Sequence, residues 1–431
     1  MIASLKRWVI EAQDRLRYSP LVRQVLSQYR LFRDSAPPAD DPQAVARSLV
    51  GLCGAARLAL DSPLMPEIEE RIRQRLELLD VGRLDWSEFV PGIDNRELTR
   101  AAVLKRWTGP REKGVLFISF EDQWVRLLRQ VDLAAFAREY DLVLAPSWSP
   151  PHSLINCVFG RVYAAPLFML ISNTADMAIL PRLAPNYLPV PLLASSWVNP
   201  GLFRPRPSEE RDIDIVMVAN WGKIKRHHLL FRALRSLPAG LRVVIIGREQ
   251  DSRTVDTVRA EARCYGVEER VELVNDLPYE KVSETLCRAR VSLVLSRREG
   301  SCVAVAESLF ADTPVGVLAD AHIGSKAFIN EDTGRLLREP DLAAQLLEFV
   351  QRAEDYRPRA WAEQNISCFR STATLNETIK QHALATGQEW TADLAPVCWR
   401  PDPVLVRPED QARLEGERRR IKDRFGIDVV P

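Results

Sequence analysis

One stretch of about 28 residues, 291–318, constrains the fold more than any other part of the chain. Its apolar run 291–295 is typical of a buried parallel strand, residues 302–311 favour a helix, and residues 314–318 favour a second strand. Strand, turn, helix and strand in this order form a βαβ unit, the building block of parallel sheets covered by helices. The sequence therefore predicts an α/β protein.

Length and charge limit the organisation and the partners. A chain of 431 residues is long for a single core, so we expect two or three domains. The 59 basic and 58 acidic residues leave a net charge of +1, which gives no argument for a nucleic acid partner. Seven scattered cysteines without a CxxC pair indicate a reduced protein without structural zinc. With no apolar segment of membrane-spanning length and no signal-peptide core, we expect a soluble, cytoplasmic protein.

The N-terminal region is predicted to be helical. Residues 1–34 have apolar side chains at helical spacing, interrupted at Ser19-Pro20, and carry seven basic residues against three acidic ones. Two interpretations stay open: a basic amphipathic helix lying on an anionic membrane surface, at the inner face, or a helix packed on its own domain. Residues 42–60 and 66–79 are also predicted helices.

Two alternating series of strands and helices follow. The first has strands at 115–120, 142–145 and 167–171 with helices at 123–138 and from 153, and the turn 121–124 between its first strand and helix has no glycine. The second has strands at 213–219, 241–246 and 271–274, with helices from 225, at 253–263 and at 279–288, before the βαβ unit. Each series predicts a Rossmann-like domain.

The rest of the chain completes the predicted domains. Residues 340–385 are predicted to be helical, and the charged stretch 415–424 of the tail to be a solvated helix. The predicted parts are a helical N-terminal extension at 1–112, a first Rossmann-like domain at 113–200, a second at 206–352, and C-terminal helices and tail at 353–431.

Two carboxylates bracket the turn of the βαβ unit. Glu299 follows the first strand, at the carboxyl end where open α/β sheets bind ligands, and Glu307 lies inside the helix. Between them Gly300, Ser301 and Cys302 combine small side chains with free N–H groups at a helix N-terminus, which is an anion site. The alternative is a solvated loop glutamate followed by an exposed helix glutamate.

Glu299-Gly300-x6-Glu307, followed by Asp312-Thr313-Pro314-Val315, resembles the E-x7-E motif of the retaining glycosyltransferases of glycosyltransferase family four. The segment 195–205 is similar to that family's interdomain linker, and the resemblance covers roughly residues 195–350. It implies a GT-B fold of two Rossmann-like domains. It also implies transfer of a sugar from a nucleotide-sugar donor to a hydroxyl of a glycan or lipid-linked acceptor, with retention and without metal or cofactor.

The resemblance also assigns donor contacts. Glu307 would accept hydrogen bonds from the ribose hydroxyls and Glu299 from a hydroxyl of the transferred sugar, because ionised carboxylates are pure acceptors. The backbone of Gly300, Ser301 and Cys302 would bind sugar and phosphate oxygens. The remaining donor-side candidates are the turn residues Asn220 and Lys223, the diphosphate cation Lys225, and the base-side loop residues Gly247 and Asp276.

The turn 220–225 departs from the family pattern at one position. Asn220 stands where an arginine is expected, so either Lys223 or Arg226 replaces that charge or catalysis is weaker. A separate hypothesis makes Cys302 a nucleophile through thiolate stabilisation at a helix N-terminus, although nothing pairs a general base with it.

In the first domain the candidates are His152 and Asn173, which follow predicted strands. The alternative for His152 is an ordinary loop residue. His227 and His228 have no third ligand nearby in sequence, so no metal site is predicted.

Two other functions remain open. One is a sugar-nucleotide epimerase of the same fold, which would need acidic and histidine side chains in the first domain. The other is a non-catalytic GT-B subunit that binds a partner, which Asn220 and the glycine-free turn 121–124 favour.

Overall fold

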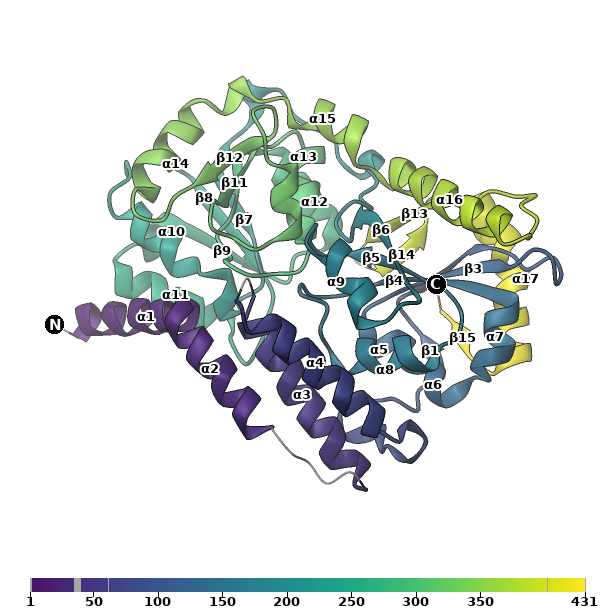
Figure 1. The fold of residues 1–431 in the computed structure, drawn as a ribbon. Coiled ribbons are helices and arrows are strands. Elements are labelled where there is room, and N and C mark those ends of the chain that lie inside the picture. The colour runs from purple at the N-terminus through teal and green to yellow at the C-terminus, as the bar shows by residue number, and fades with distance from the viewer. Residues whose placement is uncertain (1, 35–39, 61, 401, 431) are drawn as a thin grey trace. The chain divides into compact units, whose positions relative to one another are not determined.

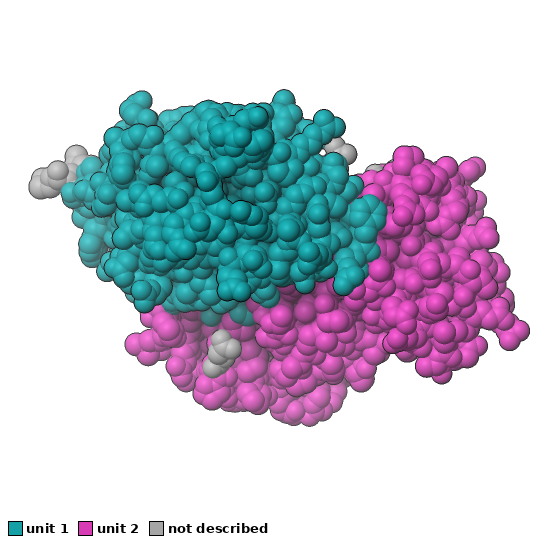
Figure 2. Space-filling view, turned by 90° about the horizontal axis from the view of Figure 1, so that it is seen from above, with its two compact units in different colours: residues 1–18, 195–370 teal, residues 19–194, 371–431 magenta. Residues whose placement is uncertain are grey.

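The computed structural model describes residues 2–34, 40–60, 62–400 and 402–430. The chain divides into two compact units (Figure 2). Unit 1 comprises residues 1–18 and 195–370, and unit 2 comprises residues 19–194 and 371–431. The predicted four-part division groups these segments differently, because the N-terminal helical region contributes to both units and the C-terminal helices return to unit 2.

A six-stranded parallel sheet forms the centre of unit 1. Its strands are β7 (Ile213–Val218), β8 (Val243–Gly247), β9 (Val271–Asn275), β10 (Ala289–Val294), β11 (Val315–Leu318) and β12 (Gly334–Leu337). Their spatial order is β12-β11-β10-β7-β8-β9. The chain thus builds the sheet outward from β7 in one direction and then restarts beside β7 with β10, so the strand order reverses between β7 and β10.

Helices cover both faces of this sheet. In Figure 1, α10, α11 and α14 lie on one side of the strands and α12 and α13 on the other. The helices of unit 1 are α1 (Ile2–Tyr18), α10 (His227–Leu234), α11 (Val255–Tyr265), α12 (Tyr279–Cys287), α13 (Val303–Phe310), α14 (Leu342–Gln351) and α15 (Pro358–Asn365). Strand β10 is almost entirely buried, which agrees with its mostly apolar sequence.

Unit 2 has a five-stranded sheet in the order β2-β3-β4-β5-β6. Its strands are β2 (Ala101–Lys105), β3 (Gly114–Ser119), β4 (Tyr140–Ala145), β5 (Leu167–Ile171) and β6 (Tyr187–Leu193). Strand β2 is antiparallel to β3 and the other neighbours are parallel. Two short pairs complete the strands: β1 (Glu97–Leu98) with β15 (Asp428–Val429), and β13 (Val397–Arg400) with β14 (Asp402–Leu405).

The helices of unit 2 include a helical cluster near its N-terminal end. They are α2 (Pro20–Arg33), α3 (Pro42–Leu58), α4 (Met65–Leu78), α5 (Glu121–Trp124), α6 (Leu127–Gln130), α7 (Leu133–Glu139), α8 (Leu154–Val162), α9 (Asp176–Leu183) and α17 (Pro408–Phe425). Helix α16 (Cys368–Ala385) crosses from unit 1 into unit 2. Helices α3 and α4 supply much of one hydrophobic core, which also includes side chains of α8.

Most predicted elements are found, with three corrections. The predicted helix 123–138 is broken into α5, α6 and α7, because Val131 is extended and Asp132 caps a new helix by accepting a hydrogen bond from the N–H of Ala135. The first 112 residues are mainly helical, as predicted, but they also contain β1 and β2, which were not predicted. The tail helix is not simply solvated: Leu414 and Ile421 are fully buried on one face of α17.

Candidate active site

The predicted donor residues flank the point where the strand order of unit 1 reverses. The turn 219–226 leaves β7, and the loop 295–302 leaves the neighbouring strand β10. In an open parallel sheet, two loops that leave adjacent strands in opposite directions open a crevice at the carboxyl edge. The sheet topology therefore brings the two predicted motifs to one place.

Lys225 and Glu299 form an ion pair across this reversal. The ammonium Nζ lies 2.7 Å from the carboxylate oxygen Oε2, and the side chains are only 14% and 10% exposed. Burial alone would lower the pKa of Lys225, but the charge and hydrogen bond of Glu299, together with Cys302 and Tyr18, outweigh it and leave the pKa above its usual value. The second oxygen of Glu299, Oε1, is buried and accepts no hydrogen bond from the described residues. It is a buried acceptor whose hydrogen-bonding capacity is unused.

Backbone contacts hold the loop that carries Glu299. The N–H groups of Gly324 and Ser325 donate to the carbonyls of Gly300 and Ser301, at 2.9 and 3.1 Å. The Ser301 hydroxyl lies 2.6 Å from Oγ of Ser195 and accepts a hydrogen bond from the Ser195 N–H. Ser301 thus fastens the loop to the start of the segment 195–205, rather than presenting its hydroxyl freely.

Glu307 is a buried carboxylate. It lies on α13, 6% exposed, and burial raises its pKa to about 7 although the nearby Tyr279 hydroxyl acts in the opposite direction. No basic side chain contributes to this pKa, so burial destabilises the ionised form of Glu307 without a charged partner to offset it. Strongly shifted titratable groups at a sheet's ligand-binding edge are typical of functional sites.

Cys302 begins α13 but is not an activated thiol. Its backbone is left-handed, with φ at 57°, and burial together with the charge of Glu299 raises the pKa of the thiol, outweighing Lys225. A nucleophilic cysteine requires a lowered pKa. This environment gives the thiolate hypothesis no support.

Asn220 stabilises the shape of the turn after β7 but brings no charge to it. The Asn220 carbonyl oxygen Oδ1 accepts a hydrogen bond from the Gly222 N–H at 3.1 Å. Lys223 is exposed, whereas Arg226 is 2% exposed and has its guanidinium on Asp14 and Glu339. Of the two residues considered as replacements for the missing arginine, Arg226 is already neutralised by carboxylates.

Gly247 and Asp276 lie at the ends of β8 and β9. The Asp276 N–H donates to the Gly247 carbonyl at 2.8 Å, and a Cβ at position 247 would meet the Ala219 carbonyl oxygen at 2.5 Å. Glycine is therefore required for close packing, whatever its role toward a ligand. Nearby, the buried Trp221 indole donates to Asn275 at 2.6 Å.

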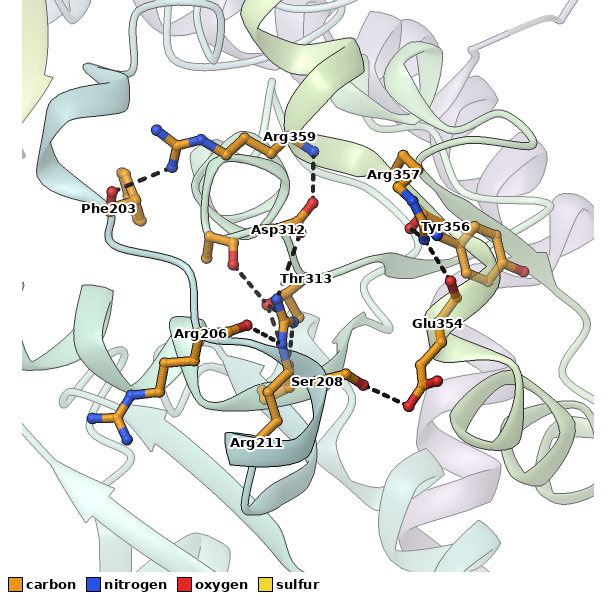
Figure 3. A network of polar contacts seen from close by, with 12 residues as sticks. Phe203, Arg206, Ser208, Arg211, Asp312, Thr313, Glu354, Tyr356, Arg357 and Arg359 are labelled. Atoms are coloured by element: carbon orange, nitrogen blue, oxygen red, sulfur yellow. Dashed lines mark hydrogen bonds and ion pairs between the residues drawn. The ribbon is translucent and has the colours of Figure 1, made fainter.

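A cluster of arginines anchors the segment 200–211 to the C-terminal end of α13 (Figure 3). Arg359 donates from its side chain to the Phe203 and Phe310 carbonyls and from its backbone N–H to Asp312. Arg211 donates to the Thr313 hydroxyl at 3.2 Å. Asp312 and Thr313, which follow the predicted motif in sequence, thus fix the helix that carries Glu307.

In unit 2, His152 belongs to a buried ion-pair group. It is fully buried, and its Nε2 lies 3.3 Å from Glu69, which also pairs with Arg182 at 2.9 Å. Burial would raise the pKa of Glu69, but these two partners lower it to about 2. This surrounding favours the structural alternative for His152 over a catalytic role.

Asn173 is half-buried at the end of β5, and its neighbour Asp176 is the more unusual residue. Asp176 is fully buried, and accepts hydrogen bonds from the N–H groups of Ser172 and Asn173 and from the Ser149 hydroxyl. Burial raises its pKa to about 6 despite these donors. Asp176 thus joins the loops that carry His152 and Asn173.

In the glycine-free turn of unit 2, a residue other than glycine adopts the left-handed backbone conformation. Phe120 adopts φ of 65°, a left-handed conformation that is usual for glycine, and α5 begins directly after it. Glu121 is buried and accepts a hydrogen bond from the Ser147 hydroxyl at 2.7 Å. The acidic residue therefore ties two loops of the sheet edge together.

Several contributors were not predicted from the sequence. Asp14 and Glu339 are far from Arg226 along the chain, and Ser195 is far from Ser301, so no local spacing indicates their contacts. Asp176 offered one signal, since it follows a predicted strand end by a few residues. In the described parts of the chain, no group of three or more histidine, cysteine or carboxylate side chains has the geometry to hold a metal ion.

The comparisons with known proteins agree with this architecture. Residues 200–365 match the family model described as "Glycosyl transferases group 1". A search of curated proteins finds no significant match. The match includes β7 to β12, the turn with Lys225 and the motif with Glu299 and Glu307.

Solved structures with a similar fold include Anabaena HepE. Its complex with UDP is 15% identical with a TM-score of 0.50, covering 62% of this chain and 78% of that chain. Its complex with UDP and glucose is also 15% identical with a TM-score of 0.50, covering 61% and 77%. Sucrose-phosphate synthase from Thermosynechococcus elongatus is 17% identical with a TM-score of 0.49, covering 63% and 74%.

These findings confirm the predicted fold class, α/β of GT-B type with two Rossmann-like domains and a helical N-terminal region. The family match over residues 200–365 supports the predicted glycosyltransferase class. The chain combines the GT-B fold with a region, residues 200–365, that matches the glycosyltransferases of group 1.

Proposed function

We propose that this protein is a retaining glycosyltransferase of family four that moves a sugar from a nucleoside diphosphate to a hydroxyl acceptor, in glycan or polysaccharide assembly. The observation that carries the proposal is the Lys225–Glu299 ion pair at the strand-order reversal of unit 1, with the buried Glu307 on the helix that follows. A cation, a free acceptor oxygen and a second carboxylate are what a diphosphate, a sugar and a ribose require.

In the proposed reaction, Lys225 and the N–H groups at the start of α13 stabilise the charge that develops on the leaving diphosphate. Oε1 of Glu299 accepts a hydrogen bond from a hydroxyl of the transferred sugar, and Glu307 accepts hydrogen bonds from the ribose hydroxyls. The bond between the sugar's anomeric carbon and the phosphate oxygen breaks, and a bond to the acceptor oxygen forms on the same face. The acceptor proton passes to the departing phosphate oxygen.

The proposed reaction uses no metal, because Lys225 and the helix N-terminus supply the positive charge. The acceptor is a glycan or a lipid-linked sugar, bound by unit 2. Asp176, with a pKa raised to about 6, is the buried carboxylate nearest in sequence to the predicted acceptor-side residue Asn173.

The test begins with a thermal-shift screen of nucleoside diphosphate sugars, since a ligand of the native state raises the melting temperature. The donor that binds is then incubated with the protein. Slow release of nucleoside diphosphate supports a transferase. Interconversion of the sugar would indicate an epimerase, and binding without turnover a non-catalytic subunit; either result would overturn the proposal.

The donor contact is tested with Glu307→Ala. Loss of charge-assisted hydrogen bonds should weaken donor binding by roughly 1.5–3 kcal/mol in calorimetry. Glu272→Ala, an exposed glutamate on β9, is the matched control and should bind normally. Equal affinity of the Glu307 variant and the wild type would remove Glu307 from the donor site.

A further inference from the structure

Helix α1 packs on unit 1 with its polar side inward. Asp14 contacts Arg226, the Tyr265 hydroxyl donates to Glu11 at 3.1 Å, and Arg7 donates to the Cys264 carbonyl at 2.9 Å. Figure 1 shows α1 running beside α11, to which Cys264 and Tyr265 belong. Polar and ionic contacts therefore help to hold this helix on its domain.

The opposite side of α1 is apolar and exposed. Leu5, Trp8, Val9 and Leu16 are 62%, 67%, 37% and 59% exposed. Their positions follow the helical repeat and place all four on one face. A helix that only covered a core would turn this face inward, so α1 has the reverse of the usual orientation for a surface helix.

Helix α2, which belongs to unit 2, repeats the arrangement. Its inward face is anchored by Leu31, which packs in the helical core, and by Ser27, whose hydroxyl donates to the Ala55 carbonyl at 3.0 Å. Its outward apolar residues are between 46% and 79% exposed: Leu21, Val25, Leu26, Tyr29 and Phe32. Nine of the fifteen exposed large hydrophobic side chains in the described parts of the chain lie on α1 and α2.

The exposed charged residues of α1 are basic, although Arg15 also lies 3.7 Å from Glu11. On α1, Lys6, Arg15 and Arg17 are exposed, while the two acidic residues, Glu11 and Asp14, contact the domain. Helix α2 contains three arginines and no acidic residue. An outward face of large apolar side chains flanked by cations is complementary to an anionic lipid surface, where apolar groups enter the acyl boundary and cations meet headgroups.

We infer that α1 is an interfacial anchor that binds the protein peripherally to a membrane rich in anionic lipids, and that α2 gives unit 2 an apolar face of the same kind. The anchor lies on the surface and does not span the bilayer, and among the helices in the described part of the chain none is long and apolar enough to cross one. Because Asp14 on α1 holds Arg226, the residue after Lys225, the anchor is tied directly to the candidate donor site.

The inference is tested by co-sedimentation of the full chain with phosphatidylcholine vesicles that contain or lack phosphatidylglycerol. The wild type should bind the anionic vesicles and bind the neutral ones much more weakly. The triple variant L5S/W8S/L16S should lose about tenfold or more in partitioning. The matched control V50S/L336S/L384S removes three other exposed apolar side chains and should bind like the wild type.

A second variant tests the charges. K6Q/R15Q/R17Q should reduce binding to anionic vesicles by about fivefold per cation, and the loss should shrink in high salt. All substituted side chains are exposed, so equal melting temperatures verify that each variant is folded.

Three results would overturn the inference: no binding of the wild type to anionic vesicles, equal binding of the wild type and L5S/W8S/L16S, or equal binding to anionic and neutral vesicles. A dimer in size-exclusion chromatography that the serine variant converts to a monomer, without vesicle binding, would instead assign the face to a contact between copies. None of these measurements uses enzymatic activity, so they are independent of the proposed function.

Discussion

Asp14 and Arg226 form a two-point ion pair: Nε of the guanidinium lies 3.1 Å and Nη2 lies 2.6 Å from the carboxylate oxygen Oδ2. Both side chains are nearly buried, at 9% and 1% exposed. Arg226 itself has a left-handed backbone, with φ of 56°, at the junction between the Lys225 turn and α10. The first helix of the chain thus stabilises the geometry of a turn more than two hundred residues away.

Replacing Asp14 should therefore destabilise unit 1. We expect Asp14→Asn to lower the free energy of unfolding by about 2–3 kcal/mol, because Arg226 loses one of two carboxylate partners in a buried position. Urea denaturation at pH 7 measures this difference. Asp256→Asn, at an exposed aspartate, is the control and should change stability little.

The same variant has a defined pH dependence. Burial would raise the pKa of Asp14, but His228 and Arg226 lower it well below its ordinary value of 3.8. The contribution of Asp14 to stability is therefore present above about pH 4 and is lost as the pH falls further. A difference between wild type and variant that grew on acidification would contradict this assignment.

Lys225→Ala should reduce turnover more than donor affinity. Removal of one preorganised group that stabilises a leaving charge costs on the order of 100-fold in kcat. Donor affinity should change less than about tenfold, because the carboxylate contacts remain. Steady-state kinetics and calorimetry separate the two effects, and Lys281→Ala, at an exposed lysine of α12, should leave both unchanged.

Glu307→Gln should change how stability varies with pH. With its pKa raised from 4.5 to about 7 by burial, Glu307 keeps its proton in the folded state where the unfolded chain has lost it. The folded state therefore binds more protons between about pH 4.5 and 7, and the free energy of unfolding falls as pH rises through that window. The glutamine variant should lack this fall, worth about 3 kcal/mol.

Chemical denaturation at pH 5 and pH 8 checks the expectation. The stability of the variant relative to the wild type should be about 3 kcal/mol higher at pH 8 than at pH 5. The exposed control Glu272→Gln should show no such change. Parallel pH profiles for wild type and Glu307→Gln would mean that the carboxylate is solvated.

Arg359→Ala should weaken the contacts that join α15, the segment 200–211 and α13 (Figure 3). The variant leaves the Phe203 and Phe310 carbonyls without their guanidinium donor, so we expect a loss of about 2 kcal/mol in unfolding free energy. Arg352→Ala, whose side chain is 63% exposed, should lose little. Hydrogen exchange that stays unchanged in α13 of the Arg359 variant would exclude this role.

Much of the fold could be predicted because its signals are local. Continuous apolar runs gave the positions of β3, β4, β5, β7 and β10, since a strand buried on both faces needs nearly every residue apolar. The break between α1 and α2 was visible in Ser19-Pro20, where Ser19 caps and Pro20 begins the second helix. Strand β2 was missed because it belongs to the sheet through antiparallel pairing with β3, not through a βαβ unit.

The candidate site also combines residues that local spacing predicts with contacts that it does not predict. The spacing of Glu299 and Glu307 indicated both carboxylates, but the partner of Glu299 is Lys225, which a different strand delivers. His152 illustrates the limit, because a histidine in a proline-containing loop gives no local sign that Glu69 will bury and pair it.

By itself, the sequence determined most of the strands and helices, and that residues 2–18 form a helix with apolar and charged sides. Only the tertiary structure decided which side of that helix faces the domain. Helix periodicity depends on neighbouring residues, whereas the inward choice depends on Arg226, Tyr265 and the Cys264 carbonyl, polar partners that the folded sheet brings to α1 from distant parts of the chain.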